Sequence, residues 1–326
     1  MATQAVSAPA STFIEEFAEK IRLGLLKGGQ KELDCKYFYD EVGSALFDVI
    51  SRLHEYGLTR AEERLLRRHS EEIAGRLNLP LIVAELGSGD GRKTRWLLEA
   101  LAKLQPTTTY CPIEISPTAL DRCKRELAHL KNVRVIGFEK DYLDGLQLVS
   151  AGRDPEQRLM VLFFGSTLGN FKREDGVRFL CEVRRLLSVG DALLLGTDLE
   201  KSAIQLLMAY DDPLGVTAAF NLNLLARINR ELEGDFVLAQ FKHEARYNAA
   251  ERRIEMYLVS LVDQTVRIAR GGFEVSFKAG ETIWTENSHK FTTEEVVFMA
   301  GQSGYSCEIQ YVDEQWPFAQ SLLFAV

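Results

Sequence analysis

The spacing of hydrophobic residues changes along this chain and separates two kinds of region. Between residues 81 and 198, short apolar runs alternate with stretches in which apolar residues recur every three or four positions. The runs predict strands and the recurring stretches predict helices. Strands separated by helices form parallel sheets covered on both faces, so this region predicts an α/β fold. The expected strands are 81–86, 108–115, 133–138, 158–164 and 191–198, and the expected helices are 92–104, one opening at Ser116-Pro117, and 173–187.

After residue 199 the apolar residues alternate with polar ones over long runs. Two helices, near 201–210 and 215–231, precede four expected strands at 236–247, 252–264, 273–278 and 281–291. Asn248-Ala-Ala and Lys278-Ala-Gly mark turns, so we expect two antiparallel hairpins. A helix at 293–302 and strands at 305–313 and 321–326 end the chain.

Two further helices are expected before the first strand, over about 12–28 and 59–77. Each opens with a threonine followed three residues later by a glutamate, the capping-box pattern. The pairs are Thr12 with Glu15 and Thr59 with Glu62.

Composition narrows the class of protein. The chain has 326 residues, 46% of them hydrophobic, and a formal net charge of −8. It can bury a large core in one or two domains, and its acidic balance argues against a nucleic-acid partner. Five scattered cysteines without a C-x-x-C pair indicate reduced thiols, and the N-terminus Met-Ala-Thr-Gln-Ala-Val-Ser lacks the features of a signal peptide. No apolar segment is long enough for a bilayer and the five histidines lack metal-ligand spacing, so we expect a cytoplasmic protein without a metal.

A cluster of glycines follows the strand predicted at 81–86. Gly87, Gly89 and Gly91 separate this strand from the next helix. Glycines at such a turn allow a ligand to approach the backbone closely. The spacing is not the G-x-G-x-x-G of dinucleotide-binding proteins, so a nicotinamide enzyme fits less well.

Acidic residues stand at the ends of the next two strands. Glu114 can accept hydrogen bonds from the two hydroxyls of a ribose, and Asp141-Tyr142 offers a carboxylate for an adenine amino group and a ring for its face. Each acid alone could be an ordinary loop residue. Together, at the carboxyl ends of successive strands, they predict an S-adenosylmethionine (SAM) site.

The last two strands resemble the antiparallel pair that completes the sheet of Rossmann-like SAM methyltransferases. We therefore predict an α/β protein with a Rossmann-like class I SAM methyltransferase sheet and an inserted α+β substrate-binding domain. Residues 61–200 with 291–326 would form the methyltransferase domain, and residues 1–60 with 201–290 the substrate-binding domain.

The chain also carries several longer motifs: Lys36–Asp48, Glu55-Tyr56 with Thr59-Arg60, Gly165–Asn170, Gly196–Leu199, Ala209–Asp212, Gly215–Asn221, Arg253–Tyr257 and Thr285–Ser288. Together these motifs resemble a specific family, the histidine Nα-methyltransferases of ergothioneine biosynthesis. The resemblance extends from about residue 12 to the C-terminus. It implies conversion of L-histidine to its trimethylammonium betaine, hercynine, in three steps with three SAM molecules.

The resemblance also implies roles for individual residues. Those that would hold SAM are Gly87, Lys93, Glu114, Asp141 and Tyr142. Asn170 and Tyr210 would hold the carboxylate of the substrate and orient its amine, with Gly165 beside them. The imidazole would be held by Tyr56, Glu286 and Ser288, with Met256 packed beside the ring. Tyr39 would line the amine end through water, so that Tyr39, Asn170 and Tyr210 form the catalytic set.

The chemistry suits these residue types. Methyl transfer from a sulfonium to an amine is an in-line displacement, so the enzyme supplies positioning and a deprotonated amine. Desolvation beside the sulfonium should lower the pKa of the amine, and its proton would leave through Tyr39 or water. Glu286 and Ser288 stand two residues apart on a predicted strand and share a face, from which both nitrogens of an imidazole could be bound.

Simpler interpretations compete with these roles. Glu286 could be a solvated strand carboxylate, Met256 could fill the core, and Tyr56 and Tyr210 could be core tyrosines. The five histidines are expected in surface or structural positions: His54, His69, His129, His243 and His289.

Two alternatives to histidine methylation stay open. One is N-methylation of a larger aromatic amino acid such as tryptophan, which would leave the Glu286 carboxylate unpaired. The other is a SAM-binding regulator without catalysis. The expected partners are free L-histidine and its mono- and dimethylated forms, bound by a monomer without nucleic acid or membrane.

Overall fold

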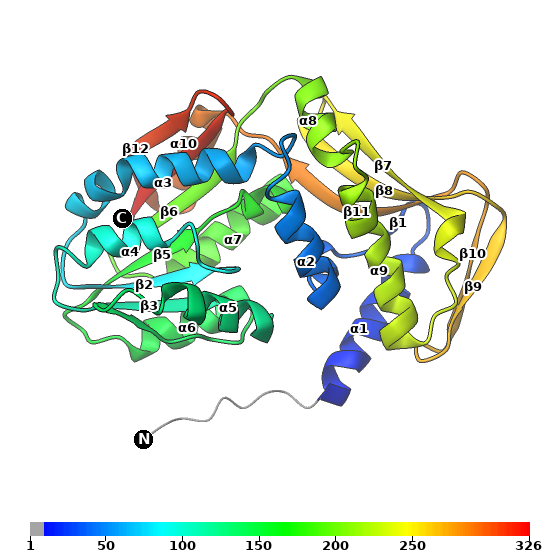
Figure 1. The fold of residues 1–326 in the computed structure, drawn as a ribbon, viewed down its shortest axis with the longest axis horizontal. Coiled ribbons are helices and arrows are strands. Elements are labelled where there is room, and N and C mark those ends of the chain that lie inside the picture. Colours follow the sequence, from blue (N-terminus) through cyan, green and yellow to red (C-terminus); the bar gives the residue numbers. More distant parts are fainter. Residues whose placement is uncertain (1–9) are drawn as a thin grey trace. The chain divides into compact units, whose positions relative to one another are not determined.

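The computed structural model describes residues 10–326, which form two compact units (Figure 1). One unit comprises Gly57–Glu200 and His289–Val326 and is called here the large-sheet unit. The other comprises the described residues up to Tyr56 together with Lys201–Ser288 and is called the small-sheet unit. Residues 1–9, which include the segment expected to lack a signal peptide, lie outside the described part.

The large-sheet unit is built on seven strands in the order β12-β13-β6-β5-β2-β3-β4. Their bounds are β2 Leu81–Leu86, β3 Thr108–Ile113, β4 Val133–Val135, β5 Arg158–Phe163, β6 Ala192–Asp198, β12 Tyr305–Asp313 and β13 Phe318–Ala325. Neighbours from β4 to β6 run parallel, whereas β13 is antiparallel to both β6 and β12. The predicted α/β fold and its antiparallel final pair are therefore confirmed.

Helices cover both faces of this sheet. They are α3 Leu58–Gly75, α4 Arg95–Leu101, α5 Pro117–Leu127, α6 Tyr142–Gly152, α7 Arg173–Arg185 and α10 Thr293–Gln302, with a 3₁₀ helix, η2, at Thr167–Asn170. Apolar side chains of α6, α7 and α10 share one core cluster with β2, β5 and β6. Every residue of β2 and β6 is buried, as expected for strands covered on both sides.

Three local predictions in this unit need correction. Helix α3 begins at Leu58 after an N-cap glycine, Gly57, that makes no side-chain cap, so Thr59 and Glu62 do not form a capping box. A Cβ at Gly57 would lie 2.1 Å from the Trp316 ring, so close packing selects this glycine. Helix α6 was not predicted, and β4 has three residues rather than six. The predicted cap at Ser116 is confirmed, with its Oγ accepting from Ala119 N at 3.3 Å.

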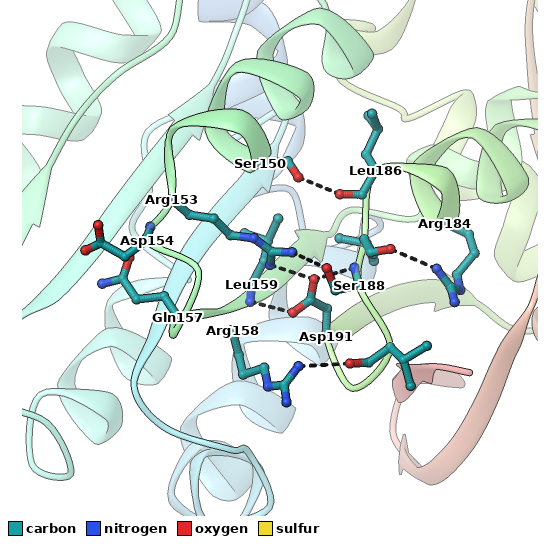
Figure 2. A network of polar contacts seen from close by, with 12 residues as sticks. Ser150, Arg153, Asp154, Gln157, Arg158, Leu159, Arg184, Leu186, Ser188 and Asp191 are labelled. Carbon is teal, nitrogen blue, oxygen red and sulfur yellow. Dashed lines mark hydrogen bonds and ion pairs between the residues drawn. The ribbon is translucent and has the colours of Figure 1, made fainter.

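Asp191 fastens the amino-terminal edge of the sheet (Figure 2). Its carboxylate accepts from Leu159 N at 2.9 Å, Ser188 N at 2.7 Å and Arg153 Nη1 at 2.6 Å. These hydrogen bonds join the starts of β5 and β6 to the chain before them. A buried carboxylate with this many donors stabilises the fold at the edge opposite to the carboxyl ends of the strands.

The small-sheet unit holds a four-stranded sheet in the order β1-β11-β8-β7 and a separate ribbon of β9 and β10. The strands are β1 Lys31–Glu32, β7 Phe241–Asn248, β8 Arg253–Ser260, β9 Gln264–Ile268, β10 Phe273–Phe277 and β11 Thr282–His289. The helices are α1 Ala10–Leu25, α2 Glu41–Ile50, α8 Ala203–Tyr210 and α9 Val216–Leu232, with 3₁₀ helices η1 Cys35–Phe38 and η3 Leu238–Gln240. Helix α1 starts before Thr12, so the capping box expected at Thr12 does not open it.

One of the two predicted hairpins is correct. β7 and β8 pair antiparallel around Asn248, as expected. The second is wrong, because β10 pairs with β9 and β11 lies in the other sheet. The predicted strand 252–264 is in fact β8 and the start of β9. Val266, Ile268, Val275 and Phe277 alternate with exposed residues, which identifies the buried face of each strand but not its partner.

Helices α8 and α9 confirm the predictions for 201–210 and 215–231. Asp212 joins them: its carboxylate accepts from Val216 N at 3.0 Å and Thr217 N at 2.7 Å. Burial opposes ionisation of Asp212, but these hydrogen bonds outweigh it and lower its pKa. No helix in the described part of the chain is both long and apolar enough to cross a membrane.

Candidate active site

The glycine loop after β2 has the backbone conformation that its sequence predicts. Gly87, Gly89 and Gly91 all have positive φ, at 70°, 54° and 72°. A Cβ at Gly87 would lie 3.2 Å from Tyr142 Oη, and a Cβ at Gly91 would lie 2.6 Å from Cys123 Sγ. At Gly87 and Gly91 a side chain is therefore disfavoured by both backbone conformation and space, and at Gly89 by backbone conformation alone.

Glu114 follows β3 and holds the loop. Its Oε2 accepts from Gly89 N at 3.2 Å and its Oε1 from Ser116 N at 3.1 Å. Burial raises the pKa of Glu114, and these backbone donors oppose that rise. The carboxylate thus lies at the carboxyl edge of the sheet, where a ribose could bind.

Asp141 and Tyr142 begin α6. Asp141 is the N-cap residue of this helix, is exposed, and makes no side-chain capping hydrogen bond. The Tyr142 ring packs edge-on against Phe163, with centroids 5.7 Å apart, and against Phe179 at 6.1 Å. Tyr142 thus offers a packed ring beside Gly87, and the exposed Asp141 carboxylate precedes it.

Lys93 forms a close ion pair with Glu62 on α3. Glu62 is fully buried and also accepts from Gly165 N at 2.9 Å and Gln320 Nε2 at 3.0 Å. The sequence pattern predicts Glu62 as a helix cap and indicates no role for it at the site. The one signal that could have found it is the position of an acid among Leu58, Ala61, Leu65 and Leu66 on the buried face of the helix.

A second buried acid, Glu85, lies beneath the glycine loop at the end of β2. It accepts from Thr94 Oγ1 at 2.6 Å and from the Tyr110 hydroxyl. Burial raises its pKa to about 7, although both hydrogen bonds act in the opposite direction. Glu85 therefore joins the start of α4 to β3 from inside the core.

The segment after β5 carries Gly165 and Asn170, both predicted to bind the substrate. Gly165 and Ser166 have φ of 71° and 58°, so the chain turns sharply where β5 ends. Ser166 Oγ accepts from Asp198 N at 2.9 Å, which ties this turn to the end of β6. Asn170 ends η2, and its side chain makes no hydrogen bond within the described residues.

The remaining predicted substrate residues lie in the small-sheet unit. Tyr210 at the end of α8 and Ser288 on β11 share a hydroxyl–hydroxyl hydrogen bond of 2.6 Å. The Tyr56 ring packs edge-on against Tyr210, with centroids 6.1 Å apart. Phe47 contacts both Tyr56 and Tyr39, at 6.2 Å and 5.6 Å. Of the predicted residues Tyr39, Tyr56, Tyr210 and Ser288, the last three are thus in direct contact: Tyr56 packs on Tyr210, and Tyr210 is hydrogen-bonded to Ser288.

Glu286 lies on the same strand as Ser288, two residues before it. The carboxylate is close enough to Cys35 in η1 for its charge to add to the rise that burial causes in the pKa of that thiol. Met256 on β8 is 1% exposed, and its carbonyl accepts from Thr285 Oγ1 at 3.1 Å. This burial is also what a core methionine shows, so the ligand role of Met256 stays a prediction.

His243 contacts the backbone of Tyr210. Its Nδ1 accepts from Asn221 Nδ2 at 2.9 Å, which leaves Nε2 to donate to the Tyr210 carbonyl at 2.8 Å. Burial lowers the pKa of His243, which keeps the neutral ring. The structural role predicted for this histidine agrees with these contacts, but its link to Tyr210 was not foreseen.

Four features together define a class I SAM-dependent methyltransferase. They are a glycine loop, an acid after the second strand, an acid–aromatic pair after the third and an antiparallel last strand. These residues are of the types that would suit SAM: Gly87 leaves space that a Cβ would fill, and Glu114 and Asp141 offer carboxylates that could accept from hydroxyl and amino groups. Within residues 10–326, no three His, Cys, Asp or Glu side chains gather into a group that could hold a metal ion.

Comparison with known proteins gives the family. A family model described as a histidine-specific, SAM-dependent methyltransferase matches residues 17–325. The histidine N-alpha-methyltransferase of Mycolicibacterium smegmatis is 40% identical over 96% of both chains, and that of Mycobacterium tuberculosis is 42% identical over 90% of both. Ergothioneine biosynthesis protein 1 of Neurospora crassa is 30% identical over 79% of this chain and 31% of its own length. The chain belongs to the histidine-specific, SAM-dependent methyltransferases, as its motifs predicted, and SAM is its methyl donor.

Proposed function

We propose that this enzyme transfers methyl groups from three SAM molecules in turn to the α-amino group of free L-histidine, giving hercynine. The observation that carries the proposal is the hydrogen bond between Tyr210 and Ser288, with Glu286 on the same strand. A carboxylate and hydroxyls arranged in this way suit the two nitrogens of an imidazole. The names of the mycobacterial relatives support the same substrate.

The large-sheet unit would hold SAM, which supplies an electrophilic methyl group on a cationic sulfur. Glu114 would accept from the ribose hydroxyls and Asp141 from the adenine amino group. Tyr142 would pack on the adenine, and Lys93 would bind the carboxylate of the methionine part. The Gly87 backbone would lie against the donor. These residues orient the donor rather than react with it.

The chain's other task is to present a neutral amine. The α-amine of histidine is largely protonated at neutral pH, so a proton must leave before its lone pair can attack. Tyr39, packed edge-on against Phe47 and Phe220, would pass this proton to water. Asn170 and Tyr210 would hold the substrate carboxylate, which fixes the amine in line with the bond that breaks.

Glu286 and Ser288 would select the side chain. Glu286 would accept a hydrogen bond from one imidazole nitrogen, and the Ser288 hydroxyl would bond the other. An apolar or indole side chain would not match the hydrogen-bonding groups of the half-buried Glu286 and the buried Ser288, and such mismatches cost several kcal/mol. We therefore infer selectivity for histidine over tryptophan.

Incubation of the purified enzyme with SAM and a panel of free amino acids, followed by mass spectrometry, tests this function. We expect mono-, di- and trimethylated histidine to appear in sequence, and added mono- and dimethylhistidine to be converted further. Methylation of tryptophan in preference to histidine would overturn the proposed substrate, and SAM binding without any methylated product would overturn the proposed catalysis.

We also propose that the enzyme acts as a monomer in the cytoplasm. Light scattering across the concentration range of the assay tests the first statement, and a constant mass of one chain is expected. Cell fractionation with a cytoplasmic marker tests the second.

A further inference from the structure

Glu62 is a fully buried charged group near the carboxyl edge of the large sheet. Its side chain is 0% exposed, whereas that of its ion-pair partner Lys93 is 26% exposed. A carboxylate removed from water costs several kcal/mol unless donors replace the lost water. The chain therefore keeps this acid in place only because donors from several elements converge on it.

Three different segments supply those donors. Lys93 comes from the loop after β2, Gly165 from the turn after β5, and Gln320 from β13. Gly165 N reaches both carboxylate oxygens, at 2.9 Å and 3.2 Å. One side chain thus connects a residue predicted to bind the methyl donor with one predicted to bind the acceptor.

The surroundings of Glu62 are adapted to it. Gln320 donates to Glu62 while its own Oε1 stays buried without a hydrogen-bond partner within the described residues. A Cβ on Gly196 of β6 would lie 2.5 Å from Glu62 Oε1, so only glycine leaves space there. An unpaired buried oxygen and a glycine within a central strand both lower stability. Such costs are more usual at functional positions than in an ordinary core.

We propose that Glu62 is a positioning residue of the transfer reaction, acting through Lys93 on the methyl donor and through Gly165 on the acceptor. An ammonium has three donor hydrogens, so one bond to Glu62 aims Lys93 and leaves the others for the carboxylate of the donor. The same acid holds the Gly165 amide and so fixes the turn after β5. Only the second half of this inference rests on the proposed function, because dependence on SAM follows from the family to which the chain belongs.

Glu62→Gln tests the first half by equilibrium binding. This substitution keeps size and shape but removes the charge and points an amide toward either Lys93 or Gly165. We expect the Kd for SAM, measured by calorimetry without histidine, to rise about tenfold. Glu63→Gln is the matched control, since Glu63 is the exposed neighbour on α3, and its Kd should not change.

A double-mutant cycle shows whether Glu62 acts through Lys93. Lys93→Met should also raise the Kd for SAM, and adding Glu62→Gln to it should change the Kd by less than about twofold. The proposal would be overturned if the factors by which the two single substitutions raise the Kd simply multiplied in the double variant. An unchanged Kd in Glu62→Gln would overturn it as well. If Glu62→Gln does not fold, Gln320→Leu removes one donor instead. It should raise the Kd about threefold without loss of the folded state, and no change in Kd would again overturn the proposal.

Steady-state kinetics test the link to Gly165. In Glu62→Gln, with SAM saturating, we expect the KM for the amino-acid acceptor to rise about fivefold, whereas a merely structural defect would lower kcat by loss of active enzyme. A normal KM at saturating SAM would overturn the second half only. Absence of histidine methylation by the wild-type enzyme would instead refute the proposed substrate and leave the SAM-binding result intact.

Discussion

The two units hold their predicted ligand residues by different means. In the large-sheet unit, backbone amides and glycines of positive φ form the loop, and the acids Glu114 and Asp141 lie at strand or helix ends. In the small-sheet unit, Tyr210 and Ser288 contact each other through side-chain hydroxyls, and aromatic rings pack around them. A site formed by backbone atoms tolerates substitution of the surrounding side chains unless an added Cβ occupies the space of the ligand. A site built from side chains is sensitive to the loss of single polar atoms.

The largest effect should follow from placing a side chain in the glycine loop. Gly87→Val adds a Cβ 3.2 Å from Tyr142 Oη at a residue with φ of 70°, so the loop must move. We expect the Kd for SAM to rise at least roughly 100-fold. Gly152→Ala is the control, since nothing lies within 4 Å of its added Cβ, and it should bind SAM normally. Tight SAM binding by Gly87→Val would show that the backbone does not form the donor site.

Removing an acid from the small-sheet unit should come next. Glu286→Ala deletes the carboxylate proposed to bind the imidazole, so kcat/KM for histidine should fall about 100-fold. With Met256→Val added, bulkier aromatic amino acids should be accepted better. Glu274→Ala, on the exposed side of β10, is the control and should leave selectivity unchanged. The same selectivity in the single and double variants as in the wild type would exclude this account of specificity.

The comparison also explains how much could be predicted from the sequence. The loop glycines, Glu114 and Asp141 were found because strand and helix order fixes which residues reach the carboxyl edge of a parallel sheet. The substrate residues came from family resemblance, since Tyr210 and Ser288 are 78 positions apart and no local pattern joins them. A backbone-built site is thus visible in a single sequence, whereas a side-chain-built site is not.

Two errors have causes in tertiary contacts. Helix α6 was not predicted because it contains a glycine, Gly145, which serves packing rather than a turn. A Cβ at Gly145 would lie 2.4 Å from Ile113 Cγ2. Glu62 was assigned to a cap because its spacing from Thr59 fits that motif. Its actual partners Lys93, Gly165 and Gln320 are 31, 103 and 258 residues away. Tertiary contacts decided both cases.

A smaller effect concerns the pH dependence of stability. The pKa of Glu85 rises from 4.5 to about 7 on folding because of burial. Between these two values the native state binds a proton that the unfolded state has released, so the free energy of unfolding falls as pH rises. The full change is roughly 3 kcal/mol. Glu85→Gln mimics the protonated acid, so the free energy of unfolding of this variant should not show this fall. Above pH 7 the variant should therefore be more stable than the wild type.

Urea unfolding of both proteins over this pH range measures that difference. Other titrating groups cancel in the comparison, and Glu63→Gln provides an exposed control that should follow the wild type. A stability difference between Glu85→Gln and the wild type that does not vary with pH would show that Glu85 stays ionised in the folded protein. Glu85 would then be a buried charged carboxylate rather than a neutral acid.

The smallest effect should be the loss of one hydroxyl from the small-sheet unit. Tyr210→Phe removes the 2.6 Å hydrogen bond to Ser288 and leaves the ring in place against Tyr56. We expect a loss of about 1 kcal/mol, seen as a fivefold rise in the KM for histidine. Tyr247→Phe is the control, because its hydroxyl makes no hydrogen bond within the described residues. If the two hydroxyls act as a pair, Ser288→Ala will add little to Tyr210→Phe; if the effects multiply, each hydroxyl binds the substrate separately and the contact between them is incidental.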